Sequence, residues 1–458
     1  MILFTMGISS VCKEVLRRIQ PSIGEDKKVK ELTHRVLDIL EEMSHKAVAV
    51  GSIGKHTWLS GDHDIDIFVL FSKEISRNDL EKMGLKIGTD VCNILKSKPI
   101  MKYAEHPYTR TVVGGYGIDI VPCYEIGSGE KIISAVDRSP LHLKYVLDNM
   151  KPEQRNEVRL LKQFMKGVNV YGSDVKHNGF SGYVCEILII KYGTFEEVLR
   201  QSMHWSLPQI IDMDQKQVNK LQGALFLKDP VDVERNAAAA VDSEKLMKFI
   251  SAAKQFLRDP GKEMFFPKLV KLSGAYVSKL KKRETYLLAL KTKRPDMIND
   301  TLFPQLRKAM ERIEGALIHE DFNVITAIEY ADNHDIVILF EFYCEKLPGI
   351  KHMTGPPINS KLHSTEFLTK YKDAEFGPYV IGKTWNVEIV RKYRKPEDLI
   401  KDFLKKDNLE QRGIAKNLVE PLKKATLIRG KAVFSLIQKN KKLSDYVRRR
   451  YFDSIRIV

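Results

Sequence analysis

Residues 51–70 place a turn of small residues before an apolar strand that carries two aspartates. The segment reads Gly-Ser-Ile-Gly-Lys-His-Thr-Trp-Leu-Ser-Gly-Asp-His-Asp-Ile-Asp-Ile-Phe-Val-Leu. Side chains alternate between the faces of a strand, so Asp64 and Asp66 share one face while Ile65 and Ile67 share the other. Two carboxylates on one face repel each other unless a cation lies between them, and Mg²⁺ is the usual companion of substrate phosphates. The segment therefore predicts metal-assisted nucleotidyl transfer.

A third acid, Asp119, occurs in a similar setting, in Gly-Ile-Asp-Ile-Val-Pro. An aspartate in the middle of a strand rich in Ile and Val is disfavoured unless it is paired or binds a metal. Taken singly, each of these acids could equally be a surface residue of an edge strand. Together they supply the carboxylates that two-metal nucleotidyl transfer requires. We predict that Asp64, Asp66 and Asp119 are catalytic residues and metal ligands.

The turn Gly51-Ser52 follows a predicted short strand at 46–50. Its backbone N–H groups and the Ser52 hydroxyl can face phosphate oxygens. It is not a Walker A loop, because no Gly-Lys-Ser/Thr follows at the required spacing. We interpret Asp62 as a loop acid and His63 as a structural histidine.

Composition limits the class of protein. A chain of 458 residues fits about three domains, and 43% hydrophobic with 29% charged residues is typical of folded globular proteins. No stretch approaches the ~18 apolar residues that span a bilayer, and the opening segment 1–6 lacks the basic start of a signal peptide. The five cysteines are dispersed without zinc or redox spacing, which favours reduced thiols in the cytoplasm.

The formal net charge of +16 suggests a polyanionic partner, and its distribution is uneven. The last 68 residues hold 20 Lys and Arg against eight Asp and Glu, which is +12 of the total. A solvated helical surface is the alternative interpretation. The run Val447–Phe452 favours nucleic acid, because aromatic residues stand beside its arginines.

Hydrophobic periodicity predicts an α+β multidomain protein. A small α+β domain ends near Asp137, helices dominate after Pro140, and strands return near residue 323. The segment Thr354-Gly-Pro-Pro357 indicates a surface loop or an inserted subdomain. The predicted helices are 27–44, 78–97, 141–149, 152–166, 182–192, 195–203, 243–258 and 306–317, and the predicted strands are 46–50, 64–71, 108–113, 116–124, 323–330 and 335–344, with the last two pairing as a hairpin.

The order Gly-Ser, eleven residues, Asp-Ile-Asp and a later Asp-Ile-Val-Pro resembles the nucleotidyltransferase superfamily that includes DNA polymerase beta. Further segments resemble the archaeal, class I CCA-adding enzymes, which are tRNA nucleotidyltransferases. This similarity is strongest over 48–236. Its segments are Ser134-Ala-Val-Asp-Arg-Ser-Pro-Leu-His142, Val158-Arg-Leu-Leu-Lys162, Tyr171-Gly-Ser-Asp174, Gly179-Phe-Ser-Gly-Tyr183 and Pro230-Val-Asp-Val-Glu-Arg-Asn236.

The resemblance implies a polymerase-beta-like nucleotidyltransferase sheet with helices in a head domain at 1–138. It also implies a helical, nucleotide-binding neck at 139–260 and an α/β RNA-binding body and tail at 261–458, with an inserted tail subdomain around 317–387. The implied substrates are CTP and ATP, the acceptor is tRNA, the cofactor is Mg²⁺ in a two-metal site, and no template is used.

Site residues carry over where this sequence matches the family. The family often has Arg where Lys55 stands and Glu where Asp64 stands, and a lysine cannot form a bidentate fork with phosphate. Gly51, Ser52, Lys55, Lys162 and Tyr171 fall where the triphosphate is held, Ser139 and His142 match positions beside the nucleotide, and Arg235 matches the residue that helps read the incoming base.

The residues alone leave alternatives for these positions. Lys162 shares a predicted helix face with Arg159 and Lys166, and a solvated face would look identical. Tyr171 could be a core aromatic residue and His142 a structural histidine. Arg235 stands in what reads as a helix start, where a capping or salt-bridge role is the alternative.

Two competing functions stay open at this point. A poly(A) or oligo-uridylyl polymerase would use the same catalytic domain, and a catalytically inactive RNA-binding protein could keep the fold. The retained acids Asp64, Asp66 and Asp119 argue against the inactive protein. The sequence leaves open whether the chain forms a homodimer.

Overall fold

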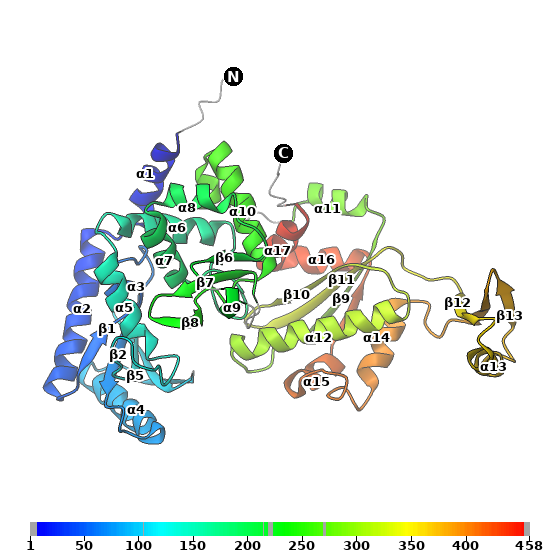
Figure 1. The fold of residues 1–458 in the computed structure, drawn as a ribbon, viewed down its shortest axis with the longest axis horizontal. Helices are drawn as coiled ribbons and strands as arrows, with labels where there is room; N and C mark the ends of the chain where they lie inside the picture. The colour runs from blue at the N-terminus through cyan, green and yellow to red at the C-terminus, as the bar shows by residue number, and fades with distance from the viewer. Residues whose placement is uncertain (1–6, 104, 214, 219–222, 269–271, 453–458) are drawn as a thin grey trace. The chain divides into compact units, whose positions relative to one another are not determined.

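The computed structural model describes residues 7–103, 105–213, 215–218, 223–268 and 272–452 (Figure 1). The opening segment 1–6, where we expected no signal peptide, lies outside these residues. The described chain divides into two compact units, one of which ends at Lys268. Among the described helices, none has the length and apolarity needed to cross a membrane.

The first unit holds two sheets and most of the helices. Its helices are α1 (Ile8–Ile19), α2 (Ile23–Glu42), α3 (Gly51–Gly54), α4 (Arg77–Ile94), α5 (Arg138–Asn149), α6 (Gln154–Gly167), α7 (Gly182–Tyr192), α8 (Phe195–Ser202), α9 (Gln215–Val218), α10 (Ser243–Arg258) and the 3-10 helix η1 (Lys262–Met264). Its strands are β1 (Ala47–Ala49), β2 (Asp64–Phe71), β3 (Ile100–Tyr103), β4 (Pro107–Val113), β5 (Tyr116–Tyr124), β6 (Gln209–Ile211), β7 (Leu225–Asp229) and β8 (Asp232–Asn236).

The N-terminal sheet has the strand order β1-β2-β5-β4-β3, and only β2 and β5 run parallel. The predicted alternation in β2 is confirmed: Ile65 and Ile67 lie in a core with residues of α2 and α4. On the opposite face, Phe68 packs in a small cluster with Leu143 of α5. Apolar packing against α2 and α4 therefore fixes one face of the sheet. The opposite face carries the aspartates at one end of the strands and packs against α5 at the opposite end.

The helical part of the first unit surrounds a large core that also includes residues of α1. At its centre, Phe164 of α6 lies 5.5 Å, ring centroid to centroid, from each of Phe195, Phe256 and Phe265. The strands β6, β7 and β8 form a small sheet in that order. This core holds α6, α7 and the β7–β8 hairpin against one another.

The second unit is built on a four-stranded antiparallel sheet of order β10-β11-β9-β15 with helices on both faces (Figure 1). Successive residues of β9 alternate between the two faces, as in a strand buried on both sides: Leu288 and Leu290 pack with α12, α14 and α15, and Leu287 and Ala289 pack with α11, α16 and α17. The elements are α11 (Gly274–Lys281), β9 (Tyr286–Lys293), α12 (Asn299–His319), β10 (Val324–Ala331), β11 (Asp335–Phe342), α14 (Pro396–Lys405), α15 (Lys416–Lys423), β15 (Thr426–Arg429), α16 (Lys431–Lys439) and α17 (Lys441–Phe452).

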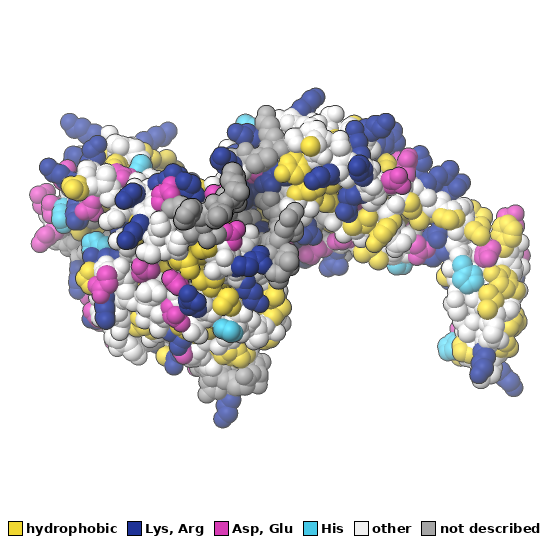
Figure 2. Space-filling view, turned by 90° about the horizontal axis from the view of Figure 1, so that it is seen from above, with side chains coloured by type: hydrophobic (Ala, Val, Ile, Leu, Met, Phe, Trp, Pro, Cys, Tyr) yellow, Lys and Arg dark blue, Asp and Glu magenta, His cyan; other side chains and the backbone are white. Residues whose placement is uncertain are grey.

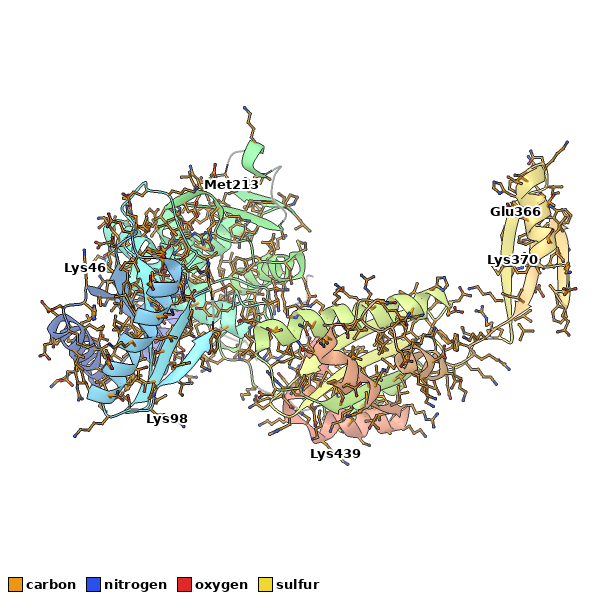
Figure 3. All side chains as sticks on the ribbon, turned by 90° about the horizontal axis from the view of Figure 1, so that it is seen from below. Lys46, Lys98, Met213, Glu366, Lys370 and Lys439 are labelled. Atoms are coloured by element: carbon orange, nitrogen blue, oxygen red, sulfur yellow. The ribbon has the colours of Figure 1, made fainter. Side chains whose placement is uncertain are left out.

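A small three-stranded sheet of order β12-β14-β13 interrupts the second unit. It comprises β12 (Ile350–Pro357), α13 (Lys361–Lys370), β13 (Phe376–Ile381) and β14 (Thr384–Val390). Glu366 and Lys370 mark α13 in Figure 3. This sheet begins at Ile350, later than the start near 317 that we expected, because β10 pairs with β11, β11 pairs with β9, and both strands thus belong to the larger sheet.

The interpretation of Thr354-Gly-Pro-Pro357 as a surface loop is wrong. These residues lie in β12, which is an edge strand with a register shift between Thr354 and Pro357. Edge strands and bulges are the places in a sheet where proline is tolerated. The alternative interpretation, an inserted subdomain, agrees with the separate small sheet.

The α+β multidomain class is confirmed, and the strand 64–71 and the hairpin of 116–124 with its partner strand have the predicted positions. The hairpin of 323–330 and 335–344 is confirmed as β10 and β11. No sequence pattern identified the remaining strands, which are β3, β6, β7, β8, β9, β12, β13, β14 and β15.

Candidate active site

The three predicted carboxylates lie on adjacent strands of the N-terminal sheet. In the parallel pair β2–β5, Asp66 is directly opposite Asp119, and Asp64 is opposite Gly117. Asp64 is 66% exposed at the end of β2, whereas the Asp119 side chain is only 13% exposed. The structure therefore brings the three acids together on one face, as the alternation in the sequence predicts.

Arg110 of β4 bridges two of these acids, and the sequence analysis missed it. Its guanidinium donates to both oxygens of Asp119, at 3.2 and 3.0 Å, and forms an ion pair with Asp64. Arg110 is opposite Asp119 across the β4–β5 pair. The alternation Thr109-Arg110-Thr111 in a strand could have indicated this residue. It places Arg110 on the face of β4 opposite to the two threonines, which are buried.

The Gly51-Ser52 turn lies directly against Asp66. Gly51 has a φ of +62°, and a Cβ at this position would overlap the Asp66 carboxylate, so two independent constraints require glycine. The backbone N–H of Val50 donates to the carbonyl of Asp66 at 2.8 Å. Burial, with the charges of Asp119 and Asp64, raises the pKa of Asp66 to about 6. The turn and the acids thus form one continuous site.

Lys55 and Lys162, which the family match places at the triphosphate, are both held by Glu186 of α7. Their Nζ atoms lie 2.8 and 3.1 Å from the two Glu186 oxygens, and Thr57 donates to the same carboxylate at 2.6 Å. Glu186 is 2% exposed. Although burial opposes its ionisation, the two ammonium groups lower the pKa of Glu186 to about 2. The pair of lysines and the glutamate form a buried cluster with one excess positive charge.

The solvated-face alternative is wrong for two of the three basic residues that share the predicted face of α6, which are Arg159, Lys162 and Lys166. Arg159 donates to the backbone carbonyls of Trp58 and His56 at 2.9 and 2.8 Å. Lys162 donates to the carbonyl and hydroxyl oxygens of Thr57 as well as to Glu186. Lys166 is the more exposed one and pairs with Asp62. This face of α6 therefore anchors the segment 56–58 rather than facing solvent.

Tyr171 lies at the same end of the site. Its hydroxyl is near the backbone of Gly182 at the start of α7, beside the Lys162 stem, as the position of an added Cβ at Gly182 shows. Burial raises the pKa of Tyr171, so its hydroxyl keeps its proton at neutral pH. Tyr171 is partly buried against the helical core, and both predicted roles are compatible with this position.

His142 and Arg235 are held by a second buried carboxylate, Asp229 at the end of β7. The Asp229 Oδ2 atom lies 3.0 Å from His142 Nε2 and 2.7 Å from Arg235 Nη1. Arg235 lies in strand β8, and the next helix begins at Ser243 with Asp242 as its cap, so the interpretation of Arg235 as a helix start is wrong. Asp229 instead ends β7, and Pro230 and Val231 form the turn of the β7–β8 hairpin.

Tyr183 of α7 connects the two clusters. Its ring stacks on His142 with centroids 3.7 Å apart, and its hydroxyl donates to Asp229 at 3.2 Å. Lys55 Nζ lies 4.9 Å from the same ring centroid. Helix α7 therefore supplies Glu186 to one cluster and Tyr183 to the other. The residues predicted to bind the triphosphate and those predicted to contact the nucleoside thus lie in adjoining clusters.

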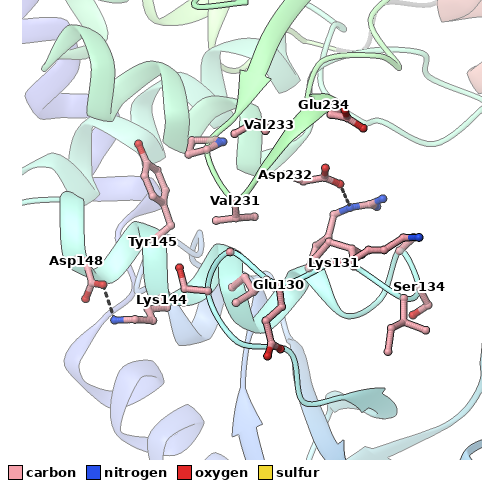
Figure 4. Close-up of a pocket in the computed structure, with 18 of the residues that line it drawn as sticks. Glu130, Lys131, Ser134, Lys144, Tyr145, Asp148, Val231, Asp232, Val233 and Glu234 are labelled. Carbon is pink, nitrogen blue, oxygen red and sulfur yellow. Dashed lines mark hydrogen bonds and ion pairs between the residues drawn. The ribbon is translucent and has the colours of Figure 1, made fainter. Parts of the chain in front are cut away.

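A pocket of about 810 Å³ lies beside this site and contains none of the predicted residues (Figure 4). It is lined by the loop 128–135, the turn after Asp229 and one face of α5. Ser139 and His142 lie on α5 but not in this lining. Acids outnumber bases in the lining, which does not suit a phosphate. The charged lining residues are Glu105, Glu130, Lys131, Arg138, Lys144, Asp148, Asp232 and Glu234.

The basic C-terminal run is partly neutralised within its own helix. In α17, Arg448 and Arg449 both pair with Asp445, at 3.3 and 2.6 Å. Tyr451 donates to Glu341 at 2.8 Å. Figure 2 shows Lys and Arg side chains spread over the viewed face of the second unit, among acidic and apolar ones. Part of the positive charge of the C-terminal segment, from which we predicted a nucleic-acid partner, is therefore neutralised by ion pairs within the second unit.

The donor chemistry of the three aspartates fits a hard divalent cation. Within the described residues, no group of three His, Cys, Asp or Glu side chains is arranged to hold a metal ion by protein atoms alone. Mg²⁺ is commonly bound through one or two carboxylates together with substrate phosphates, rather than in an all-protein cage. The site therefore suits a metal that arrives with a nucleotide.

Three family profiles match successive parts of the chain. They are described as "Nucleotidyltransferase domain" over residues 31–142, "tRNA nucleotidyltransferase, second domain" over 156–266 and "CCA-adding enzyme, C-terminal domain" over 283–430. The first two profiles match the first unit, and the third matches the second unit. The three aspartates lie within the first profile, and His142 is the last residue that it matches.

Curated relatives match most of the chain. The CCA-adding enzyme of Methanocaldococcus jannaschii is 36% identical over 437 residues, covering 90% of this chain and 94% of that protein. That of Methanosarcina barkeri is 38% identical over 402 residues, covering 85% and 88%. Among solved structures, that of Cid1, which is described as having RNA terminal uridylyl transferase activity, covers 56% of this chain and 98% of its own at 13% identity. Its TM-score of 0.44 is too low to bear on function.

Replacing Asp66 by Asn should stabilise the metal-free protein. The pKa of Asp66 is about 6 when folded and near 3.9 when unfolded, so ionisation of this residue costs stability above pH 6. We expect D66N to raise the free energy of unfolding by about 1–3 kcal/mol at pH 7.5 in EDTA, measured by urea denaturation. The gain should shrink as the pH falls from 6 to 4, because the wild-type carboxyl then becomes protonated. The exposed, Arg110-paired Asp64 provides the control D64N, which should show no gain; a destabilised D66N at pH 7.5 would contradict the assignment.

Replacing Glu186 by Gln should destabilise the first unit strongly. Removing one partner of a buried ion pair costs about 3–5 kcal/mol, and here it leaves two ammonium groups without a countercharge. The same substitution at Glu125, which pairs with Lys46 at the surface, should change the free energy of unfolding by about 0–1 kcal/mol. Equal effects of E186Q and E125Q in urea denaturation would show that the buried cluster does not hold the lysines.

Proposed function

The chain belongs to the family of CCA-adding enzymes, and we propose that it adds C, C and A to the 3′ end of tRNA from CTP and ATP without a template. Relatives at 36–38% identity over 85–90% of the chain support this activity. The observation that carries the chemistry is the register that places Asp66 opposite Asp119, with the Gly51 backbone against the Asp66 carboxylate. A nucleotide that contacts this turn has its phosphates beside the acids.

We propose that Asp64, Asp66 and Asp119 bind two Mg²⁺ ions and act as the catalytic residues. Bound metal would lower the pKa of the tRNA 3′ hydroxyl and neutralise charge on the phosphates. The chain's own part is to hold the acids on one rigid face, so that the carboxylates need not reorganise when the substrates bind. The raised pKa of Asp66 indicates a carboxylate that gains from a nearby cation.

For the triphosphate we propose Gly51, Ser52, Lys55, Lys162 and Tyr171. The Lys55–Lys162–Glu186 cluster carries net positive charge close to the Gly51-Ser52 turn. Lys162 already donates hydrogen bonds to Thr57 and Glu186. It therefore stabilises a phosphate by long-range electrostatic attraction, or it must break one of these hydrogen bonds to contact the phosphate directly. Among the described residues, Lys55 Nζ donates one such bond, to Glu186, and Lys55 is the more available of the two lysines.

For the nucleoside we propose Ser139 and His142 on α5 and Arg235 on β8, of which His142 and Arg235 both contact Asp229. The basic second unit would bind the tRNA backbone by phosphate contacts, with recognition by shape. We also propose the boundaries 138/139 and 260/261 for the head, neck and body, a cytoplasmic location, and a homodimer as a state to be tested by light scattering.

The activity is tested with tRNA transcripts that end before CCA, after C and after CC. With Mg²⁺ and radiolabelled CTP or ATP, we expect two C and then a single A, and no product from Asp66→Ala. Asp26→Asn, which alters a surface pair with Lys30, is the matched control and should be active. Long runs of A or U on any RNA would favour a poly(A) or oligo-uridylyl polymerase. Binding of tRNA without addition would favour an inactive RNA-binding protein.

Arg110 should compete with the metal for the carboxylates. Replacing it by Met removes the guanidinium that bonds Asp64 and Asp119, and we expect Mn²⁺ to bind about tenfold more tightly without nucleotide. Electron paramagnetic resonance of free Mn²⁺ measures this directly. Arg77→Met, at a surface pair with Glu81, is the control. Weaker Mn²⁺ binding by R110M would mean that Arg110 shapes the metal site rather than competing for it.

A further inference from the structure

Residues 56–63 form a link between the Gly51-Ser52 turn and strand β2, and side chains of the surrounding helices hold it. Arg159 of α6 holds its first part. The Arg159 Nη2 atom donates to the carbonyl of His56 at 2.8 Å, and Nε donates to the carbonyl of Trp58 at 2.9 Å. One guanidinium therefore fixes two carbonyls that are two residues apart.

The second part of the link is held by α2 and α6. Glu25 of α2 accepts from the Ser60 hydroxyl at 2.9 and 3.1 Å and from the backbone N–H of Gly61 at 3.1 Å. Lys166 of α6 donates to the two Asp62 oxygens at 3.2 and 3.1 Å. The link is therefore held along its length, and not only where it joins the turn and the strand.

Arg159 is a buried cation without an acidic partner. It is 8% exposed, and its third nitrogen, Nη1, donates to Asn156 Oδ1 at 2.8 Å. Arginine is almost never fully buried unless it is paired, yet no carboxylate of the described chain pairs with Arg159. Burial lowers the pKa of Arg159 to about 10, so the group is charged at neutral pH. A buried charge without a counterion is expected where an anionic ligand binds nearby.

We propose that Arg159 is a positioning residue for nucleotide binding: it fixes the backbone of 56–58 beside the Lys55 and Lys162 ammonium groups, and its buried charge attracts the triphosphate without contacting it. This inference rests on the proposed function. It deepens that function by giving a role to a residue outside both the metal site and the proposed triphosphate set.

The two carbonyls that Arg159 holds lie on either side of Thr57. The Thr57 hydroxyl donates to Glu186 at 2.6 Å and accepts from Lys162 at 2.9 Å, and the Thr57 carbonyl accepts from Lys162 at 3.3 Å. Three successive carbonyls of the link therefore accept from side chains of α6. By fixing the backbone on both sides of Thr57, Arg159 fixes the hydroxyl that bonds both the lysine and the glutamate.

The backbone at His56 shows why such a contact is needed. His56 has a φ of +57°, in the left-handed region that residues other than glycine seldom adopt. A backbone of this kind persists where the surrounding contacts hold it. The hydrogen bond from Arg159 to the His56 carbonyl is one of these contacts, so removing it should let the link relax away from its present conformation.

The task requires an arginine. A planar guanidinium presents several donors in a fixed plane and can bond two separate carbonyls at once, whereas a lysine has one nitrogen at the end of a flexible chain. R159K therefore keeps the positive charge but cannot reproduce both backbone contacts, and R159A removes both. The two variants separate the charge of Arg159 from its geometry.

The first test measures the affinity for ATP by equilibrium dialysis. We expect R159A to bind ATP about 10- to 100-fold more weakly than the wild type, with R159K in between. Affinity for tRNA should be equal in the three proteins. Arg200→Ala, which removes a surface pair with Glu196, is the matched control and should bind ATP normally. Unchanged ATP affinity in R159A, or a parallel loss of tRNA affinity, would overturn the inference.

Chemical rescue distinguishes positioning from a general structural role. Guanidinium at millimolar concentration, far below its denaturing range, can enter the space that R159A leaves, and we expect it to restore part of the ATP affinity. Ammonium at the same concentration carries the same charge without the planar fork and should not restore it. Equal rescue by the two cations would contradict a role for the fork.

A further measurement uses the wild-type protein and does not depend on the folding of R159A. Proton–nitrogen NMR of ¹⁵N-arginine-labelled protein, with Arg159 assigned by R159K, reports how fast its Nε–H exchanges with water. We expect slow exchange with and without ATP, because the bond to the Trp58 carbonyl is kept. Fast exchange in the presence of ATP would mean that the guanidinium turns to the phosphates, and would overturn the inference.

The proposed function can fail separately. If the wild type adds neither C nor A to tRNA, while R159A still binds ATP more weakly than the wild type, the proposed function is overturned and the role of Arg159 in nucleotide binding stands.

Discussion

The repulsion among three aspartates on one face of a sheet is the constraint around which the first unit is arranged. The parallel pairing of β2 with β5 places Asp66 next to Asp119, and this register is set by the buried opposite face, where Ile65 and Ile67 pack against α2 and α4. A shift of one residue would bury the acids and expose the isoleucines. The apolar packing thus holds the like charges in place, and Arg110 supplies the compensating charge from β4.

Two buried carboxylates, one on α7 and one on β7, hold basic side chains of the site in place. Glu186 binds Lys55 and Lys162, and Asp229 binds His142 and Arg235. Buried pairs of this kind contribute little net stability relative to apolar packing, because desolvation offsets the attraction. What they determine here is geometry. Helix α7 connects the two clusters through Glu186 and Tyr183, so an error in its position would displace both ends of the site together.

Strand β2 and its acids could be predicted from the sequence because the pattern that indicates them lies within a short segment. Alternation of apolar and acidic residues shows which face of the strand the acids occupy, and the Gly51-Ser52 turn precedes the strand. The partners of the other site residues could not be predicted, because they lie far apart in the chain. Lys55 and Glu186 are 131 positions apart, and His142 and Asp229 are 87 apart. Glu186 did leave a signal, since it is one charge within the apolar run of α7. Arg235 was read as a helix start because Asp229-Pro230 suits a helix N-terminus as well as a hairpin turn.

The small sheet of β12, β13 and β14 enters and leaves the second unit at a single point. Ile350 pairs with Val390 across its first and last strands, and Arg391 donates to the carbonyl of Gly349 at 2.8 Å. No residue of 350–390 belongs to either apolar core of that unit. In evolutionary terms this makes the segment a cassette: it can lengthen, shrink or be exchanged between lineages at its closed base, while the cores that support the larger sheet stay intact.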